Sequence, residues 1–398
     1  MTGPLDGIDV VDFTQMMQGG WAIQKLGDLG ADVVKIEPVE GEYEREEAVN
    51  GRFLDGVSPW FLAMNRNKRS LPLDLKTDEG LAVAEDLVRE ADVVAENFRP
   101  GVMDSLGLGY EDVQDLNPDV VYVSASGWGS DGPYSDRPGQ DLLAQATSGL
   151  ATITGRTSEP PTTAGTFIAD QLSATGIALY TVAALVHREQ TGEGQLVETN
   201  LLNALLDGLT QEITATLNMD IEYDRSEAGV AHAALGAPYG FYETEDGYVA
   251  ISLAPVPDLA DIFGDDSLRE YDTPRDWFEY RDEIKRTVEG HTRKYETAEL
   301  LEVLVEADVW AAEVLDFHEM AEDPQVRHNE MIVELDHPEV GRYETTGLPF
   351  EMSVTPGELR SSAPLLGEHT EDVLSEMGYD EDTIEKLVAD GVTKRARE

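Results

Sequence analysis

The 398-residue sequence contains no cysteine. The chain can therefore form neither a disulfide nor a thiolate metal site, and a cysteine nucleophile is excluded. Basic residues are scarce as well, since 28 lysines and arginines stand against 80 aspartates and glutamates, and the formal net charge is -52. This charge is spread along the whole chain. Functions that depend on attraction to a polyanion are disfavoured, so we expect neither nucleic acid nor an anionic membrane as a partner.

The acidic composition suits a halophilic protein, because the Debye length falls to roughly 3 Å at 1 M salt and charges then repel one another less. The N-terminus, Met1–Asp6, lacks the basic and apolar regions of a secretory signal. Apolar runs such as Ile177–Val186 are shorter than the about 20 residues that a bilayer requires. We therefore expect a cytoplasmic protein outside the membrane.

Short β-branched runs alternate with helical stretches in the first two hundred residues, which predicts an α/β chain with parallel βαβ units. The expected strands are 7–13, 31–37, 91–96 and 120–126, and the expected helices between them are 20–29, 78–90 and 110–116. Two deeply packed helices are expected at 172–188 and 197–217, a hairpin around Glu245–Gly247, and a last helix capped by Thr370. The length favours two domains. We place the N-terminal part of a large α/β domain at 1–219, a small domain at 220–330, and a segment returning to the large domain at 331–398.

Asp170 is a single carboxylate at the entrance of the apolar stretch Gln171–His187. An acid in such a place is costly to bury unless it is paired, hydrogen-bonded or chemically active. Two interpretations stay open and are compatible: a helix N-cap, since aspartate is favoured there, and a catalytic group.

Several familiar sites are missing. The turn after the first strand, Thr14–Gly20, lacks the Gly-x-Gly-x-x-Gly fingerprint of a dinucleotide-binding fold. His318 has no second histidine at the spacing of a zinc protease, and no serine stands in a Gly-x-Ser-x-Gly elbow. We therefore predict no metal site and no permanently bound cofactor.

The rare basic residues gather after the predicted strands. Arg66, Lys68 and Arg69 form one cluster, and Lys76, Arg99 and Arg137 follow in later loops. Ligands of open α/β sheets bind at the carboxyl ends of the strands. These residues indicate either a pocket for a phosphate-bearing ligand or a surface patch that balances nearby acids.

Several ordered motifs together resemble the class III CoA-transferases, the family of formyl-CoA transferase and carnitine CoA-transferase. The motifs are Pro4–Ile8, Asp12–Thr14, Leu29–Glu37, Asn65–Ser70, Glu96–Gly101, Leu106–Tyr110, Thr191–Gln195 and Leu365–His369. The resemblance covers about residues 4 to 215 densely, the middle weakly and the C-terminal segment again. It implies an interlocked homodimer, in which each chain has a large doubly wound domain and a smaller α+β domain.

The resemblance also implies site residues. Asp170 matches the catalytic nucleophile, and the segment Arg137–Asp141 stands near the thioester. The candidate donors to an oxyanion are the Gln140 side chain and backbone N–H groups at the start of the Asp170 helix. The implied coenzyme A site comprises Met17, Gln18, Leu73, Lys76, Asn97, Phe98, Arg99 and Arg137. Pro38, Ser105 and Pro138 replace basic residues frequent in the family, so the phosphate contacts differ.

The implied activity is CoA transfer from an acyl-CoA to a carboxylic acid through aspartyl intermediates. The acidic composition and a likeness to dicarboxylate-using members indicate a haloarchaeal enzyme with succinyl-CoA as donor and a C4 or C5 dicarboxylate such as mesaconate as acceptor. A second carboxylate requires a cation, for which Arg45, Arg52, Arg66 and Arg137 are candidates. The alternatives are intramolecular CoA transfer, a non-catalytic CoA-binding protein, and α-methylacyl-CoA racemase chemistry. Racemases of this fold use a Gly-His-Asp motif, and Gln140 takes the place of the titrating histidine.

Overall fold

The structure, a computed structural model, describes residues 3–219 and 221–396. The chain divides into two compact units. The first combines the chain up to Ala144 with Phe167–Gly208 and with everything from Pro324 onward, and the second combines Gln145–Thr166 with Leu209–Asp323. Both units are therefore discontinuous in sequence. The domain boundaries drawn from the sequence alone stay a prediction.

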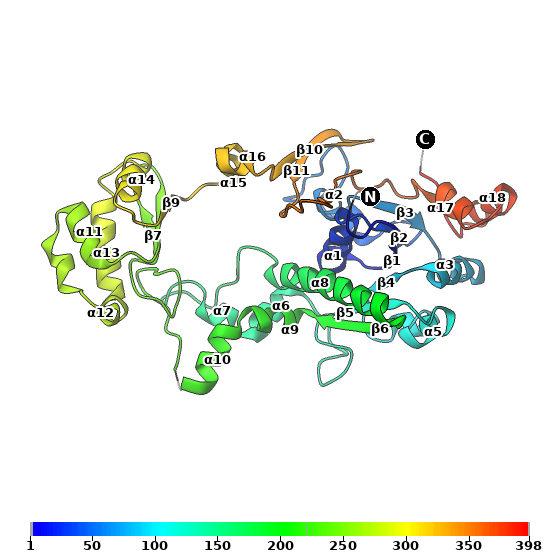
Figure 1. Ribbon diagram of the computed structural model, residues 1–398, viewed down its shortest axis with the longest axis horizontal. Helices are drawn as coiled ribbons and strands as arrows, with labels where there is room; N and C mark the ends of the chain where they lie inside the picture. The colour runs from blue at the N-terminus through cyan, green and yellow to red at the C-terminus, as the bar shows by residue number, and fades with distance from the viewer. Residues whose placement is uncertain (1–2, 220, 397–398) are drawn as a thin grey trace. The chain divides into compact units, whose positions relative to one another are not determined.

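The first unit is built on a six-stranded parallel sheet with the order β3-β2-β1-β4-β5-β6 (Figure 1). The strands are β1 (Asp9–Asp12), β2 (Asp32–Glu37), β3 (Lys68–Pro72), β4 (Val93–Glu96), β5 (Val121–Ser126) and β6 (Gln195–Asn200). The strand order changes direction on either side of β1, which creates a crevice at the carboxyl ends of β1 and β4. The predicted α/β class with a parallel sheet is confirmed.

Helices cover both faces of this sheet. Neighbouring strand residues point to opposite sides, and apolar residues on both sides are buried by the helices. Val11 belongs to an apolar cluster with the helices α3, α5, α17 and α18, whereas Val10 belongs to a second cluster with α1 and α8. The helices of this unit are α1 (Met16–Asp28), η1 (Tyr43–Glu46), α2 (Pro59–Met64), α3 (Asp78–Glu90), α4 (Val102–Ser105), α5 (Tyr110–Leu116), α8 (Ile168–Thr191), α9 (Leu201–Gly208), α16 (Pro324–His328), α17 (Thr370–Glu376) and α18 (Glu381–Ala389). The antiparallel pair β10 (Ile332–His337) and β11 (Gly341–Thr346) completes it.

The second unit combines helices with a three-stranded antiparallel sheet of order β7-β8-β9. Its elements are α7 (Leu150–Ile153), α10 (Thr210–Met219), β7 (Gly240–Glu243), β8 (Tyr248–Ile251), α11 (Val256–Phe263), η2 (Asp266–Glu270), α12 (Pro274–Glu279), α13 (Arg281–Thr292), α14 (Thr297–Glu306), β9 (Ala311–Glu313) and α15 (Phe317–Glu322). Helix α6 (Asp141–Ser148) begins in the first unit and ends in the second. The expected hairpin around Glu245–Gly247 is present between β7 and β8.

The prediction of a single helix at 197–217 is wrong. Its first residues form β6, which pairs in parallel with β5, and α9 and α10 follow as separate helices. Leu196, Val197 and Thr199 are apolar or β-branched, and a short run of such residues fits a buried helix as well as a strand. Pairing with the open edge of β5 selects the strand. Helix α10 also has no buried residue, contrary to the expectation of deep packing. Thr370 begins α17, but its hydroxyl donates to the Lys394 carbonyl and does not cap the helix.

Among the described residues, α8 alone is long and apolar enough, by length and composition, to cross a membrane. It occupies the place of a core helix instead, because Ala174, Ile177 and Ala178 pack with α1 against the sheet. Its other face carries Leu179 and Tyr180, which are exposed.

Candidate active site

A pocket of about 670 Å³ lies at the carboxyl ends of β1, β4 and β5, wholly within the first unit. The turn after β1 contributes Met16 and Gln18, and the loop after β4 contributes Asn97 and Arg99. The segment after β5, the first turn of α8, and residues in and next to η1 and α2 form the remaining sides. The topology thus gathers residues more than 150 positions apart at one edge of the sheet.

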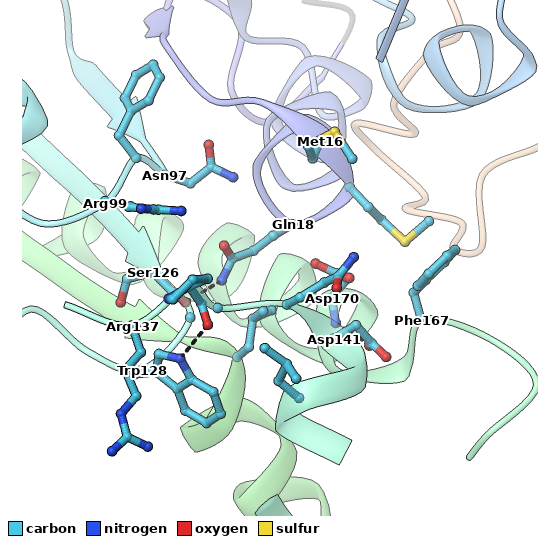
Figure 2. A pocket seen from close by; sticks show the side chains of 18 of the residues that line it. Met16, Gln18, Asn97, Arg99, Ser126, Trp128, Arg137, Asp141, Phe167 and Asp170 are labelled. Atoms are coloured by element: carbon cyan, nitrogen blue, oxygen red, sulfur yellow. Dashed lines mark hydrogen bonds between the residues drawn. The ribbon is translucent and has the colours of Figure 1, made fainter. Parts of the chain in front are cut away.

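Asp170 is the third residue of α8 and faces this pocket (Figure 2). Burial and, as the smaller cause, the negative charge of Asp141 together raise the pKa of its carboxyl to about 7. No hydrogen-bond or ion-pair partner of its carboxylate is found in the described part of the chain. Phe167 occupies the N-cap position of α8, so the N-cap interpretation of Asp170 is wrong. A desolvated carboxylate without a partner fits a nucleophile better than a structural acid.

The start of α8 is capped from outside the helix. Asp141, the buried first residue of α6, accepts hydrogen bonds through Oδ2 from the backbone N of Ala169 at 2.7 Å and of Asp170 at 3.3 Å. These two N–H groups were expected to serve an oxyanion, but they are already engaged. Gln140 is exposed and lines the pocket, and its side-chain amide has no partner among the described residues. Gln140 therefore remains available as a donor.

Two glycines place the segment that carries Gln140 and Asp141. Gly127 follows β5 and faces Gly139 so closely that a Cβ on either residue would lie 2.3 Å from the Cα of the other. Only glycine fits at both positions, because backbone would have to move for any side chain. This contact brings the residues after Gly139 to the beginning of α8.

The turn between β1 and α1 is held by Asn97. Its Oδ1 accepts from the Gln15 backbone N at 2.7 Å, and its Nδ2 donates to the Gln15 carbonyl at 2.7 Å. Gln18 is fixed in a similar way, since its Nε2 donates to the Ser126 carbonyl at 3.1 Å and to Ser173 Oγ at 2.9 Å. The side chains of Asn97 and Gln18 thus shape the pocket wall. Both N–H groups of the Gln18 amide are engaged in these bonds, whereas Asn97 uses one of its two.

The pocket has two basic residues, Arg99 and Arg137. Both side chains lie on one side of Asp170, and Phe167 lies on the other side (Figure 2). The guanidinium of Arg137 stacks 3.8 Å over the ring of Tyr134, which meets Trp128 edge to face. Such stacking orients the guanidinium while its N–H groups stay free for an anion.

The structure brings most of the predicted site residues to this pocket, but not all. Those that line it are Met17, Gln18, Asn97, Phe98, Arg99, Arg137, Gln140 and Asp170. Leu73 lies instead in the core beneath α3, with 2% of its surface exposed, and Lys76 is exposed in the following loop. Neither contributes to the pocket wall in this structure.

The candidate cations for a second carboxylate are also separated by the fold. Arg45 forms an ion pair with Glu37 at 2.6 Å, and Arg66 forms one with Asp28 at 2.8 Å. Arg52 is exposed and does not line the pocket. Of the four candidates, Arg137 alone faces the pocket.

Sequence reasoning missed Glu44 and Trp60 in the pocket wall, and it placed Asp141 near the thioester without giving it a role of its own. Burial and the neighbouring charge of Glu42 raise the pKa of the Glu44 carboxyl to about 7. The available signal for Asp141 was its place directly after Gly139 and Gln140. Its partners lie 28 and 29 positions away, beyond the reach of any local pattern. No cluster of three or more metal-ligating side chains occurs among the residues that the structure describes.

The chain is similar to known proteins along nearly its whole length. The sequence model described as "CoA-transferase family III" matches residues 5–370. Succinyl-CoA:mesaconate CoA-transferase of Haloarcula hispanica is 34% identical, over 94% of this chain and 97% of that protein. Succinyl-CoA:glutarate CoA-transferase of Mus musculus is 33% identical, over 98% of this chain and 91% of that protein. The crystal structure of a CAIB/BAIF family protein from Brucella suis superposes with a TM-score of 0.84, at 30% identity, over 95% of this chain and all of that one.

Proposed function

The chain belongs to CoA-transferase family III and is an enzyme that transfers coenzyme A, and from this premise we propose a specific reaction for it. Coenzyme A moves from succinyl-CoA to a small C4 or C5 dicarboxylate such as mesaconate, with Asp170 as the nucleophile. The observation that carries the proposal is the unpartnered, desolvated carboxylate of Asp170 in the pocket at the sheet's carboxyl edge.

The proposed chemistry is a series of acyl substitutions at Asp170. The carboxylate attacks the donor thioester, which forms a mixed anhydride and releases the CoA thiolate. The thiolate attacks the aspartyl carbonyl, which forms an aspartyl-CoA thioester and releases the donor acid as its carboxylate. The acceptor carboxylate then attacks this thioester, and the returning thiolate attacks the acceptor's carbonyl, so that a new thioester forms and Asp170 is regenerated. One thioester is exchanged for another, and no other energy source is required.

Arg99 and Arg137 support this reaction through their position. A guanidinium suits phosphate oxygens and carboxylates equally well, because its N–H groups match either anion. We assign the CoA phosphates to the side of the pocket where these arginines lie. Gln140 is free to donate a hydrogen bond to the oxyanion that develops beside Asp170.

The names of the relatives support a dicarboxylate acceptor. Succinyl-CoA:mesaconate, succinyl-CoA:glutarate and formyl-CoA:oxalate CoA-transferases all match this chain, and each name contains a dicarboxylic acid as acceptor. The racemase alternative is disfavoured, since Gln140 cannot carry a proton near neutral pH. Intramolecular CoA transfer would use the same residues and would need no external acceptor.

A substrate panel tests the proposal. The purified protein is incubated at high salt with succinyl-CoA and with oxalate, mesaconate, glutarate or acetate, and the thioester products are identified by mass. We expect a new dicarboxyl-CoA product with mesaconate or a similar acid. Transfer to none of the dicarboxylates, or transfer to acetate alone, would refute the acceptor class. A CoA shift within the donor that proceeds without added acid would favour the intramolecular alternative.

The rate of transfer is expected to depend on pH in a defined direction. Because burial and Asp141 raise the pKa of Asp170 to about 7, the fraction of ionised nucleophile grows as the pH rises through this value. We expect kcat/KM to fall about tenfold per pH unit below 7 and to level off above it. The pKa of Glu44 is also raised to about 7, so Glu44→Gln is the control. This variant should leave the acid limb of the profile, the fall of kcat/KM below pH 7, at the same pH. A flat profile between pH 5 and 8 would contradict this assignment.

We also propose that the enzyme acts as a cytoplasmic homodimer in concentrated salt. The net charge of -52 supports adaptation to salt, because screening relieves repulsion in a compact chain. Exposed apolar side chains such as Leu179 and Tyr180 on α8 support the dimer, because a second copy of the chain would bury them. Light scattering in 2 to 3 M KCl is the test, and a monomeric mass for the active protein would contradict the dimer.

A further inference from the structure

The segment between β5 and α6 brings a second buried acid next to the nucleophile, and the acyl substitutions above do not involve this acid. Asp141 is 2% exposed. Its side chain accepts a hydrogen bond from the backbone N of Asp170, the residue that carries the reacting carboxylate. Buried acids are rare unless their oxygens are satisfied, and here one oxygen accepts two N–H groups. A contact to the nucleophile's own backbone affects both its position and its electrostatic surroundings.

We propose that Asp141 is a positioning residue for CoA transfer: it anchors the first turn of α8, from which the Asp170 carboxylate projects, and it holds a second negative charge beside that carboxylate. This inference rests on the proposed role of Asp170. It assigns Asp141 no contact with the substrate and no covalent step.

The anchoring part follows from the geometry of the helix start. The first N–H groups of a helix have no partner within it, and Phe167 at the N-cap provides no side-chain acceptor. Asp141 supplies the missing acceptor from α6, so the first turn of α8 is fixed to the segment that Gly127 and Gly139 place. Without this acceptor the turn is free to shift, and a displacement of about 1 Å can lower an enzyme's rate about 100-fold.

The electrostatic part follows from the charges around Asp170. The titratable or charged side chains that share its pocket are Tyr43, Glu44, Glu47, Arg99, Arg137 and Asp141. Among these, the charge that raises the pKa of Asp170, after burial itself, is that of Asp141. A more basic carboxylate is a better nucleophile toward a thioester once it is ionised, and repulsion from Asp141 increases this basicity.

Two substitutions separate the two parts. Asp141→Asn keeps an oxygen that accepts from Ala169 and Asp170 but removes the charge, so we expect the acid limb of kcat/KM to move down by roughly one pH unit, while kcat on the plateau stays within about tenfold of wild type. Asp141→Ala removes acceptor and charge together, so we expect the same shift of the limb and a fall of kcat by about 100-fold. Asp136→Asn removes one charge from the exposed part of the same segment and should leave the limb unchanged.

The titration of Asp170 is read independently of turnover by NMR of protein labelled with ¹³C at the aspartate carboxyls. A lower pKa of Asp170 in Asp141→Asn, together with a rescued kcat relative to Asp141→Ala, would establish the role. Brisk transfer with an unmoved acid limb, or equal kcat in both variants, would overturn it. If the wild-type protein transfers CoA to no acid while the NMR pKa still moves, the coupling stands and the proposed transfer to dicarboxylates fails.

Discussion

Replacing Asp170 by asparagine is expected to lower the rate of CoA transfer on the order of 10⁴-fold or more. Asparagine has nearly the same shape, but its amide neither attacks a thioester nor becomes a leaving group. Because the Asp170 carboxylate has no partner among the described residues, its loss breaks no contact that the fold depends on. Transfer of CoA from succinyl-CoA to a dicarboxylate, followed by product mass, measures the effect.

The same variant separates catalysis from binding. Calorimetry should give a dissociation constant for CoA within a few fold of wild type, because Arg99 and Arg137 are untouched. In the wild-type protein, hydroxylamine or borohydride added during turnover should modify the peptide that contains Asp170, and the variant should stay unmodified. Retained transfer by Asp170→Asn, or a wild-type peptide that stays unmodified during rapid exchange, would remove Asp170 from the covalent role. Lost activity together with lost CoA binding would indicate a structural defect instead.

Replacing Lys68 by methionine is expected to lower the free energy of unfolding by about 3 to 5 kcal/mol. Lys68 Nζ donates to Asp12 Oδ2 at 2.8 Å, to the Gly20 carbonyl at 2.8 Å and to Asn65 Oδ1 at 3.0 Å, and both charged side chains are fully buried. Methionine fills a similar volume but removes the ion-pair partner of the Asp12 carboxylate, and Lys35 remains as the second cation that lowers the pKa of Asp12. Removing one partner of a buried pair costs far more than the pair itself contributes, because the remaining charge keeps its desolvation penalty.

Urea unfolding at constant KCl measures this loss, since guanidinium would change the ionic strength. The matched control is Arg89→Met, which breaks the exposed pair with Asp86 on α3 and should cost about 0 to 1 kcal/mol. A loss below 1 kcal/mol for Lys68→Met would show that Asp12 becomes protonated or hydrated in the variant. Equal losses in the two variants would likewise contradict a special contribution of the buried pair.

Local patterns predicted much of the first unit and one hairpin of the second. The helices 78–90 and 110–116 were predicted with the bounds found for α3 and α5, and the hairpin after residue 240 is present. These elements carry their signals within a few residues, as β-branched runs, apolar periodicity and turn glycines. Strand β6 was not predicted, because its conformation depends on the open edge of β5, which lies about 70 residues earlier in the chain.

The sequence by itself determined the acidic, cysteine-free character of the protein, the βαβ order, the resemblance to its family and the prominence of Asp170. Each of these follows from composition or from residues near one another in the chain. Only the tertiary structure decided that Asp141 caps α8, that Arg45 and Arg66 are used in ion pairs, and that Arg137 faces the pocket. The reason is physical: hydrogen bonds, burial and charge coupling act over a few ångströms in space, and these partners are joined by the fold and not by the chain.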